Sequence, residues 1–327
     1  MKKMLALGLC LALSLLLVRP GHAEGLKLNL ISGPVTGGWY VGMGVVGKAI
    51  SSEYPDVAIT MLPGAASTNP IRVSRGLADL GIMQVALGTA AREGMAPFKS
   101  KVGNLCSLVS WGDLSPLSFV IREDTGITSL DDIAARKAPL RIAVGNRGGG
   151  GDVYGAWVLG EYGITWDKIK EWGGAVYFNS YDDMTNMAKD GQVDMIIWLG
   201  RGESWFLSEI TKDIKMRWLS IKPEVVAKVN EKYGMVPAVV PGKLYSGRVG
   251  GEDIPSVAEV TGLIVRQDMD EDTVYRITKA ICQRREDIIK GFPTWETFTL
   301  ETATQNLPFP LHPGAEKYYR ETGALKQ

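Results

Sequence analysis

Histidine is scarce in this sequence, and its scarcity removes much of the usual catalytic machinery. Of 327 residues only two are histidines, His22 and His312. His22 stands just before an expected cleavage site, so a histidine-activated nucleophile or an imidazole metal site would depend on His312. That residue lies in a Leu-His-Pro-Gly turn, which favours a structural role. We therefore expect no metal site.

Other catalytic motifs are missing as well. The chain has no Gly-x-Ser-x-Gly elbow, no Gly-Lys-Ser/Thr phosphate loop and no obvious pair of carboxylates placed as acid and base. Residues 42–47 match a dinucleotide-binding glycine pattern, but these glycines fall inside an expected helix. Pro63 and Gly64 also stand where that pattern requires an acid. We predict a chain that is not an enzyme and uses no cofactor.

Neither sign of charge is in excess. The sequence has 36 basic and 36 acidic residues and no long charged run. Because nucleic-acid binding needs a basic face, nucleic acid is not expected as the main partner.

Long apolar runs are limited to one, at residues 4–18. It follows two lysines and ends before small residues at −3 and −1 of a cut after Ala23, as in a signal peptide. The run is short for a membrane span, although a retained anchor is the alternative. Cys10 lies inside the run rather than at its end, which argues against lipidation. We predict cleavage of residues 1–23 and a periplasmic mature protein.

Cysteine is also rare, and cleavage would leave only Cys106 and Cys282. The first lies in a strand-like run and the second in a helical one. In an oxidising compartment they either pair or remain two buried thiols, and the sequence leaves both alternatives open.

What the sequence does contain is a glycine-rich turn between a strand and a helix. The apolar run 26–31 predicts a buried strand, residues 32–40 the turn, and the apolar spacing from Tyr40 onward a helix. Glycines allow close approach of the backbone, and the first N–H groups of a helix lack partners inside it. Such a turn is typical of an anion receptor, or alone of a tight connection.

The same plan returns later in the chain. A strand at 140–144 precedes the glycine turn 145–152, and a helix is expected over 153–162. The two units also close alike, because in each a glycine, Gly76 or Gly191, is followed by two residues, an Asp and then a strand. Two α/β units of one plan are therefore expected, and their glycine turns, facing each other, would form a cleft.

This duplication predicts the fold. We expect an α/β, two-lobed periplasmic-binding-protein fold (type II-like), with a ligand cleft between the lobes and hinge closure around the ligand. A return strand near 262–266 indicates that the chain crosses back, and one long amphipathic helix follows over 271–290. We place lobe I at 24–120 plus 255–327 and lobe II at 121–254.

Polar residues near the turns are candidate ligand contacts. Gln84 is expected at the carboxyl end of a strand, where open α/β sheets bind ligands. Arg147 and Arg201 are each able to clamp a carboxylate through two hydrogen bonds, or are solvated surface arginines. Asp152 begins the second helix, where it either complements the helix dipole or accepts a bond from a ligand amine. Asn69 is expected to cap a short helix.

Several stretches together resemble the TAXI-type periplasmic solute receptors of TRAP transporters, over nearly the whole mature chain. The similar stretches are Gly-Trp-Tyr-Val-Gly-Met-Gly at 38–44, Gly-Ala-Ala-Ser-Thr-Asn at 64–69, Gly-Leu-Ala-Asp-Leu-Gly-Ile-Met-Gln at 76–84 and Leu-His-Pro-Gly-Ala at 311–315. The resemblance implies a receptor that captures a small organic acid or amino acid. It also implies docking on membrane subunits of a TRAP transporter, with transport driven by an ion gradient rather than ATP.

The resemblance maps ligand-facing positions onto Tyr40, Asn69, Gln84 and the turn of 149–152. With the neighbours of both turns, the predicted ligand-binding set is Gly38, Trp39, Tyr40, Ala66, Ser67, Asn69, Gln84, Arg147, Gly149, Gly150, Gly151, Asp152, Trp198 and Arg201. Trp39, Val41, Ala66 and Gly150 depart from the family pattern, and hydroxyl groups are lost there. Fewer polar partners predict a carboxylate that is less polar than glutamate, or differently shaped.

Two other functions stay open at this point. One is a ligand-sensing partner of a membrane receptor, or a receptor for an ATP-driven importer. The other is an exported enzyme on the same fold, for which the sequence offers no reactive group.

Overall fold

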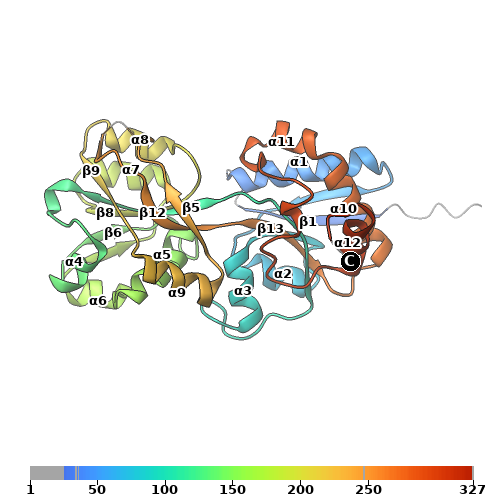
Figure 1. The fold of residues 1–327 in the computed structure, drawn as a ribbon, viewed down its shortest axis with the longest axis horizontal. Helices are drawn as coiled ribbons and strands as arrows, with labels where there is room; N and C mark the ends of the chain where they lie inside the picture. The colour runs from blue at the N-terminus through green and yellow to red at the C-terminus, as the bar shows by residue number, and fades with distance from the viewer. Residues whose placement is uncertain (1–25, 34, 36, 246, 326–327) are drawn as a thin grey trace, which may run out of the picture.

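The computed structural model describes residues 26–33, 35, 37–245 and 247–325. The expected signal peptide and Cys10 lie outside these described residues. Within them, none of the helices has the length and apolar character needed to cross a membrane. Figure 1 shows two α/β halves side by side, which we call lobe I and lobe II, with strands running between them.

Lobe I is built on a sheet with the strand order β2-β1-β3-β13-β4. Its strands are β1 Lys27–Ile31, β2 Ala58–Leu62, β3 Leu80–Gln84, β4 Leu105–Ser110 and β13 Thr261–Arg266. Its helices are α1 Gly38–Glu53, α2 Asn69–Ser74, α3 Val85–Glu93, α10 Glu271–Gln283, α11 Arg285–Gly291 and α12 Pro313–Glu321, with short 3₁₀ turns at Pro293–Trp295 and Thr302–Thr304. Strands β1, β2 and β3 are parallel, and β13 runs antiparallel to β3.

Lobe II is built on a sheet with the order β10-β12-β5-β8-β6-β7, and β9 and β11 extend it beside β5. Its strands are β5 Ser115–Arg122, β6 Arg141–Ala143, β7 Ala175–Tyr177, β8 Met195–Leu199, β9 Met216–Leu219, β10 Val236–Val240, β11 Arg248–Val249 and β12 Ile254–Glu259. Its helices are α4 Leu130–Ala135, α5 Gly150–Glu161, α6 Trp166–Glu171, α7 Tyr181–Lys189, α8 Trp205–Thr211 and α9 Pro223–Tyr233, with a 3₁₀ turn at Glu123–Thr125. Strands β6, β7 and β8 are parallel, and β5 runs antiparallel to β8.

The repeated plan read from the sequence is confirmed in the backbone. Each lobe has a set of three parallel strands, and the strand that comes first in the sequence lies in the centre of each set: β2-β1-β3 and β7-β6-β8. One aspartate closes each set in the same way. The Oδ2 atom of Asp79 accepts the N–H of Asn29 at 2.7 Å, and Oδ2 of Asp194 accepts the N–H of Arg141 at 2.8 Å. Each aspartate also donates its own N–H to the carbonyl of the same partner, at 2.8 Å in both lobes.

Two short links carry the chain between the lobes. The first joins β4 to β5 across residues 111–114, and the second is the single residue Val260 between β12 and β13. The lobe boundaries expected at 120/121 and 254/255 fall within β5 and β12, which both belong to the sheet of lobe II.

The helices cover the sheets with buried apolar faces. Val274, Ile277, Ile281 and Ile288 all point inward as expected and are at most 1% exposed. The expectation of one continuous helix over 271–290 was wrong, because α10 ends at Gln283 and α11 restarts at Arg285. Arg284 between them leaves the helical conformation, and its Nε donates to Oε2 of Glu53 on α1 at 3.1 Å. The bend keeps both helices packed on α1.

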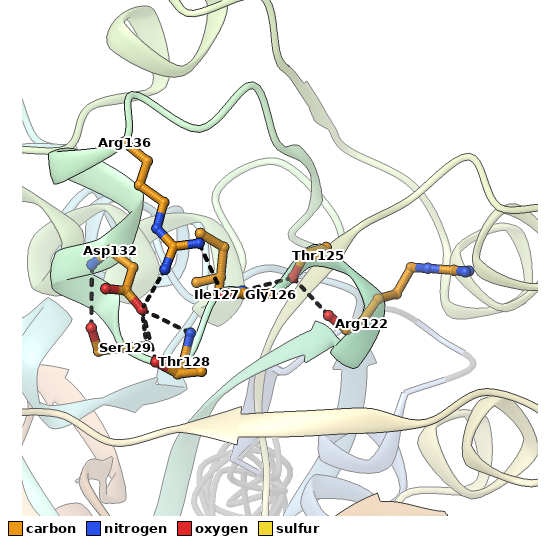
Figure 2. Close-up of polar contacts among 8 residues, drawn as sticks. All are labelled: Arg122, Thr125, Gly126, Ile127, Thr128, Ser129, Asp132 and Arg136. Carbon is orange, nitrogen blue, oxygen red and sulfur yellow. Dashed lines mark hydrogen bonds and ion pairs between the residues drawn. The ribbon is translucent and has the colours of Figure 1, made fainter.

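The start of α4 illustrates how short helices of lobe II are fixed locally. Ser129 is the N-cap, and its Oγ accepts the N–H of Asp132 at 3.2 Å. The Asp132 carboxylate in turn accepts the N–H groups of Thr128 and Ser129 at 2.9 and 3.0 Å, as Figure 2 shows. This reciprocal capping satisfies N–H groups that the first turn of a helix leaves without partners.

The paired aspartates yield a first prediction. Asp79→Ala and Asp194→Ala should each lower the free energy of unfolding by about 1–3 kcal/mol, because each leaves a strand N–H without its acceptor. Urea unfolding followed by circular dichroism measures the change. Asp167→Ala serves as the control, since its side chain is 85% exposed and surface changes usually stay within about 0.5 kcal/mol. Equal stability of all three variants would contradict a structural role for the repeated aspartates.

Candidate functional site

The strand registers turn the carboxyl edges of both parallel sets toward each other. In lobe I, Gln84 at the end of β3 pairs with Thr261 at the start of β13, next to the second link. In lobe II, Leu199 at the end of β8 pairs with Leu117 near the start of β5, next to the first link. Since the other parallel strands end on the same side, the loops after β1, β2, β3, β6, β7 and β8 meet between the lobes. We call this region the interlobe junction; open α/β sheets bind ligands at such edges.

The glycine turn of lobe I leads directly into α1. Gly37 is the N-cap, and among the described residues no side chain caps the helix and no acid lies in its first turn. Gly38 is exposed and Tyr40 is partly buried. Trp39 is partly buried against the core of lobe I, and it packs so closely on Gly33 that a Cβ there would lie 3.2 Å from the Trp39 Cβ.

Asn69 ties the loops of lobe I together and has no free polar atom. Its Nδ2 donates to the carbonyls of Ser32 and Ile82, both at 2.8 Å, and its Oδ1 accepts the N–H of Ala65 at 3.0 Å. The residue is fully buried. The N-cap of α2 is Thr68, not Asn69 as expected from the sequence, because the Asn69 backbone is already helical. Its side chain therefore fixes the loops after β1 and β2 relative to each other and to strand β3.

The two lobes touch where these turns meet. Gly148 of lobe II has a left-handed φ of +75°, and a Cβ on it would lie 3.2 Å from the Ser67 Oγ of lobe I. Ser67 and its neighbour Ala66 are partly buried. The structure thus brings the loop after β2 against the glycine turn after β6.

The glycine turn of lobe II ends earlier than expected. Gly149 is the N-cap of α5, so Gly150, Gly151 and Asp152 lie within the first helical turn. A Cβ on Gly151 would lie 2.4 Å from the carbonyl oxygens of Val144 and Ile197, so only glycine fits there. The Asp152 carboxylate accepts the N–H of Gly148 at 2.8 Å and the indole N–H of Trp166 at 3.0 Å. Both of its oxygens are therefore used inside lobe II.

Gln84 lies at the centre of the junction. Its Oε1 accepts the hydroxyl of Tyr154, on α5 of lobe II, at 3.0 Å, and both residues are buried. Burial raises the pKa of Tyr154 well above its ordinary value, so the phenol stays a donor. This bond joins the end of β3 to the second glycine unit.

The two arginines predicted from the sequence differ in their partners. The Arg147 guanidinium lies 3.7 Å from the centre of the Phe178 ring, and the residue is exposed. Among the described residues no carboxylate pairs with it. Arg201 instead crosses the junction: its Nη2 lies 2.7 Å from Oε1 of Glu296, and its Nη1 donates to the Thr294 carbonyl at 3.2 Å. Arg147 is thus the cation that remains available.

Trp198, the last of the predicted residues, lies on β8 and is partly buried. Its ring meets Phe206 edge-on, with centroids 5.9 Å apart. It therefore belongs to the aromatic packing behind the junction.

Sequence reasoning missed two buried acids at the links. The first acid accepts two hydrogen bonds from Thr261: Asp113 Oδ1 accepts the Thr261 backbone N–H at 3.0 Å and its Oγ1–H at 2.8 Å. Burial raises the pKa of Asp113 to about 6. Glu259 Oε2 accepts the N–H of Ala86 in the first turn of α3 at 3.2 Å, while Oε1 has no partner among the described residues. Burial, with the nearby Asp113, raises the pKa of Glu259 well above its usual range.

The remaining candidates for chemistry are structural. His312 is buried, and its Nδ1 accepts the N–H of Gly314 at 3.2 Å, so it caps α12. Cys106 and Cys282 are both free thiols. Among the described residues no group of histidine, cysteine and acidic side chains is arranged to hold a metal ion.

Two surface hollows lie away from the junction, on the α1 and α11 side of lobe I. Their volumes are about 480 and 540 Å³. The first is lined largely by charged residues around Arg284 and the second includes Lys48 and Lys290. Neither includes a residue of the predicted ligand-binding set.

The buried acid at the first link predicts a pH dependence. A carboxyl with a raised pKa holds its proton more tightly when folded, so its contribution to stability is lost as pH rises from about 4 to about 6. For Asp113 the shift from 3.8 to about 6 corresponds to at most about 3 kcal/mol. The Asn side chain of the Asp113→Asn variant does not ionise. The free energy of unfolding of this variant, minus that of the wild type, should therefore increase by up to that amount between pH 4 and pH 7.

Urea titrations at both pH values test this, with Asp167→Asn as an exposed control. Parallel pH profiles for the wild type and Asp113→Asn would show that the buried carboxyl is not linked to folding.

Solved structures with the same architecture are found among binding proteins. PhnD1 from Prochlorococcus marinus, in complex with methylphosphonate, is 14% identical with a TM-score of 0.52, over 92% of this chain and 99% of that one. MatC from Rhodopseudomonas palustris, with bound malate, is 14% identical with a TM-score of 0.51, over 90% and 97% of the two chains. XAC2383 from Xanthomonas citri, bound to ATP, is 14% identical with a TM-score of 0.50, over 91% and 96%.

These likenesses show the fold: the chain has the α/β, two-lobed fold of periplasmic binding proteins, as the duplicated units predicted. A family match extends over nearly all of both lobes, from Leu30 in β1 to Gly323 after α12, that is residues 30–323. The chain belongs to the NMT1-like family.

Proposed function

We propose that this protein is an extracytoplasmic solute-binding receptor that captures a small organic acid or amino acid between its lobes. The observation that carries the proposal is Arg147. Its guanidinium lies on the Phe178 ring at the carboxyl edge of lobe II, with no carboxylate partner among the described residues. A planar guanidinium in such a place binds a carboxylate through two hydrogen bonds.

The opposite edge suits the same ligand. The N-terminus of α1 carries no acid in its first turn, and its leading N–H groups face the junction. Helix N-termini attract anions through these N–H groups and the helix dipole. An anion held between Arg147 and α1 would therefore be attracted from both lobes.

The predicted ligand-binding residues divide into two proposed roles. We assign ligand contact to residues that border the junction, namely Gly38, Tyr40, Ser67, Gln84, Arg147 and the turn at Gly149 and Gly150; all but the buried Gln84 are exposed or partly buried. We assign positioning to Trp39, Ala66, Asn69, Gly151, Asp152, Trp198 and Arg201, whose side chains or backbones are already packed or bonded within the protein. For Asp152 we favour an interaction with the helix dipole over a bond to a ligand amine, because both of its carboxylate oxygens already accept hydrogen bonds within lobe II.

Closure of the lobes about the two links is part of the proposal. The Tyr154–Gln84 and Arg201–Glu296 bonds cross the junction, and an exposed ion pair such as the second contributes only about 0–1 kcal/mol. Bonds of this strength hold the lobes together while allowing them to part. Hinge motion of two lobes around a ligand is a known device.

The structural neighbours support a small anionic ligand. PhnD1 was solved with methylphosphonate and MatC with malate. Both ligands are small acids, and both proteins share this fold. We extend to this chain only the general class of ligand, a small organic anion.

The transport system is proposed from the sequence resemblance. We infer a TAXI-type receptor that delivers its solute to the membrane subunits of a TRAP transporter, after export by the signal peptide of residues 1–23. A receptor for an ATP-driven importer, or for a membrane sensor, is the alternative. Solute uptake distinguishes these alternatives when cells express the receptor together with the membrane subunits encoded by neighbouring genes. For a TRAP transporter, dissipating the ion gradient should stop uptake, whereas depleting ATP at a constant gradient should not.

Arg147 provides the test of binding. Arg147→Ala should weaken the binding of the best small carboxylate by about tenfold to a hundredfold, because a bidentate charged pair contributes about 1.5–3 kcal/mol. Arg147→Lys should recover part of the affinity. Isothermal titration calorimetry against a panel including malate, glutamate and methylphosphonate measures the change.

The matched control is Arg75→Ala, which removes an exposed arginine at the end of α2, on the opposite edge of the lobe I sheet. It should leave affinity unchanged. Equal affinities for Arg147→Ala and the wild type would remove Arg147 from the site, and a panel in which no acid binds, or in which one is chemically consumed, would overturn the receptor proposal.

A further inference from the structure

Several exposed apolar side chains belong to the loops and helix starts that border the interlobe junction. The large hydrophobic side chains that are more exposed than usual near the junction are Val35, Val41, Leu114, Tyr181 and Trp205, with exposed fractions from 43% to 60%. Three more such side chains, Leu77, Val239 and Leu300, lie elsewhere on the described surface. Val35 and Val41 come from the turn and first helical turn of lobe I, and Leu114 lies in the first link. Exposed apolar side chains rimmed by polar residues mark a binding site where they lie together, and Tyr181 and Trp205 do so because both pack on Phe206.

Two of these side chains are aromatic and come from lobe II. Tyr181 begins α7 after β7, and Trp205 begins α8 after β8, so both lie at the carboxyl edge that faces lobe I. Tyr181 is 45% exposed and Trp205 is 58% exposed. We call this pair the aromatic wall.

The aromatic wall is fixed from behind by one buried ring. Phe206 stacks on Tyr181 with centroids 4.7 Å apart and planes 7° from parallel. It meets Trp205 edge-on, with centroids 6.0 Å apart, and Trp198 edge-on at 5.9 Å. Packing on Phe206 already restricts the two outer rings. Ligand binding against them therefore costs little side-chain conformational entropy.

The free cation lies beside the wall. A Cβ on Gly145, at the start of the lobe II turn, would lie 3.8 Å from Cε1 of Tyr181. Arg147, two residues farther on, rests on Phe178, which itself precedes Tyr181 by three residues. One edge of one lobe therefore presents a guanidinium and an exposed aromatic surface side by side.

The glycine turn itself offers a ligand few polar side chains. Asn146 is the one uncharged side chain in the turn of 145–151 that has hydrogen-bonding groups, because the other residues are glycines and Arg147. Asp152, which follows the turn, has both carboxylate oxygens occupied. A ligand rich in hydroxyl or ammonium groups would leave several of them unpaired against this turn.

We propose that the ligand of this site is a carboxylate bearing an aromatic or similarly flat apolar group, with the carboxylate on Arg147 and the ring against Tyr181 and Trp205. This inference rests on the proposed function and names the class of solute for the same site. It concerns the solute and not the docking of a membrane subunit, because the wall lies at the starts of α7 and α8, on the edge that carries Arg147.

Matched pairs of acids test the inference by calorimetry. The probes are 3-phenylpropionate against butyrate, and phenylpyruvate against pyruvate. The wild type should bind each phenyl acid at least tenfold more tightly than its aliphatic partner. Trp205→Ala and Tyr181→Ala should each abolish most of that gain while changing the affinity for the aliphatic acid less than twofold, and Tyr181→Phe should keep it.

The controls separate this inference from the receptor proposal. Leu77→Ala removes an equally exposed apolar side chain far from the junction and should change nothing, and 3-phenylpropanamide, which keeps the ring without the charge, should bind weakly. Binding of aliphatic acids without any gain from the ring would overturn the aromatic class and leave the receptor proposal standing. A gain that survives both alanine variants would also overturn it, and failure of every carboxylate to bind would overturn both proposals.

Discussion

The antiparallel register of β13 on β3 and of β5 on β8 is the constraint on which this structure depends. Each crossing strand enters its lobe beside the carboxyl end of a parallel set, as the pairs Thr261–Gln84 and Leu117–Leu199 show. Both parallel sets therefore end at the junction, and so do all six of their loops. A slip of the register by one residue would exchange the two faces of the strand. Because β3 and β13 are buried along nearly their whole length, core packing on both faces holds the register in place.

That constraint explains why buried carboxyl groups are found at the links. A link that leaves one sheet and enters another has N–H groups that no strand neighbour satisfies. Asp113 supplies an acceptor for Thr261, and Glu259 supplies one for Ala86 at the start of α3. An ionised carboxylate in such a place costs several kcal/mol of desolvation, which is why the pKa of each is raised. The links thus keep their backbone bonded through groups that prefer to remain protonated, and lobe movement about them would disturb this arrangement first.

Local patterns in the sequence were enough to predict the duplicated units. Gly76 and Gly191 both adopt the left-handed conformation that a helix end followed by a turn requires, with φ of +71° and +67°. The aspartates after them then bond the central strand in both lobes. Such features depend on residues close in sequence, and their spacing is visible without a structure.

Features that depend on contacts between distant segments were not predictable in this way. No local sequence pattern around Glu259 predicts its contact with Ala86, because the two residues are 173 positions apart in the sequence. Asn69 was expected to cap a helix, whereas its bonds to Ser32 and Ile82 depend on α2 meeting the loop after β1 and the strand β3 in space. The strand at 236–240 was hidden by Pro237, which is tolerated because β10 lies at the sheet edge.

The packing of Trp39 in lobe I leads us to attribute ligand selectivity to residues of lobe II instead. Its ring is the largest departure from the family pattern in the first turn, but it packs on Gly33 and joins the core of lobe I. It therefore shapes the loop that carries the start of α1. The rings with free surface are on lobe II, where Tyr181 and Trp205 stay exposed although burying them would stabilise the fold. Leaving this apolar area in water is unfavourable for the free protein, and a ligand that covers it with a ring while its carboxylate binds Arg147 would recover that free energy.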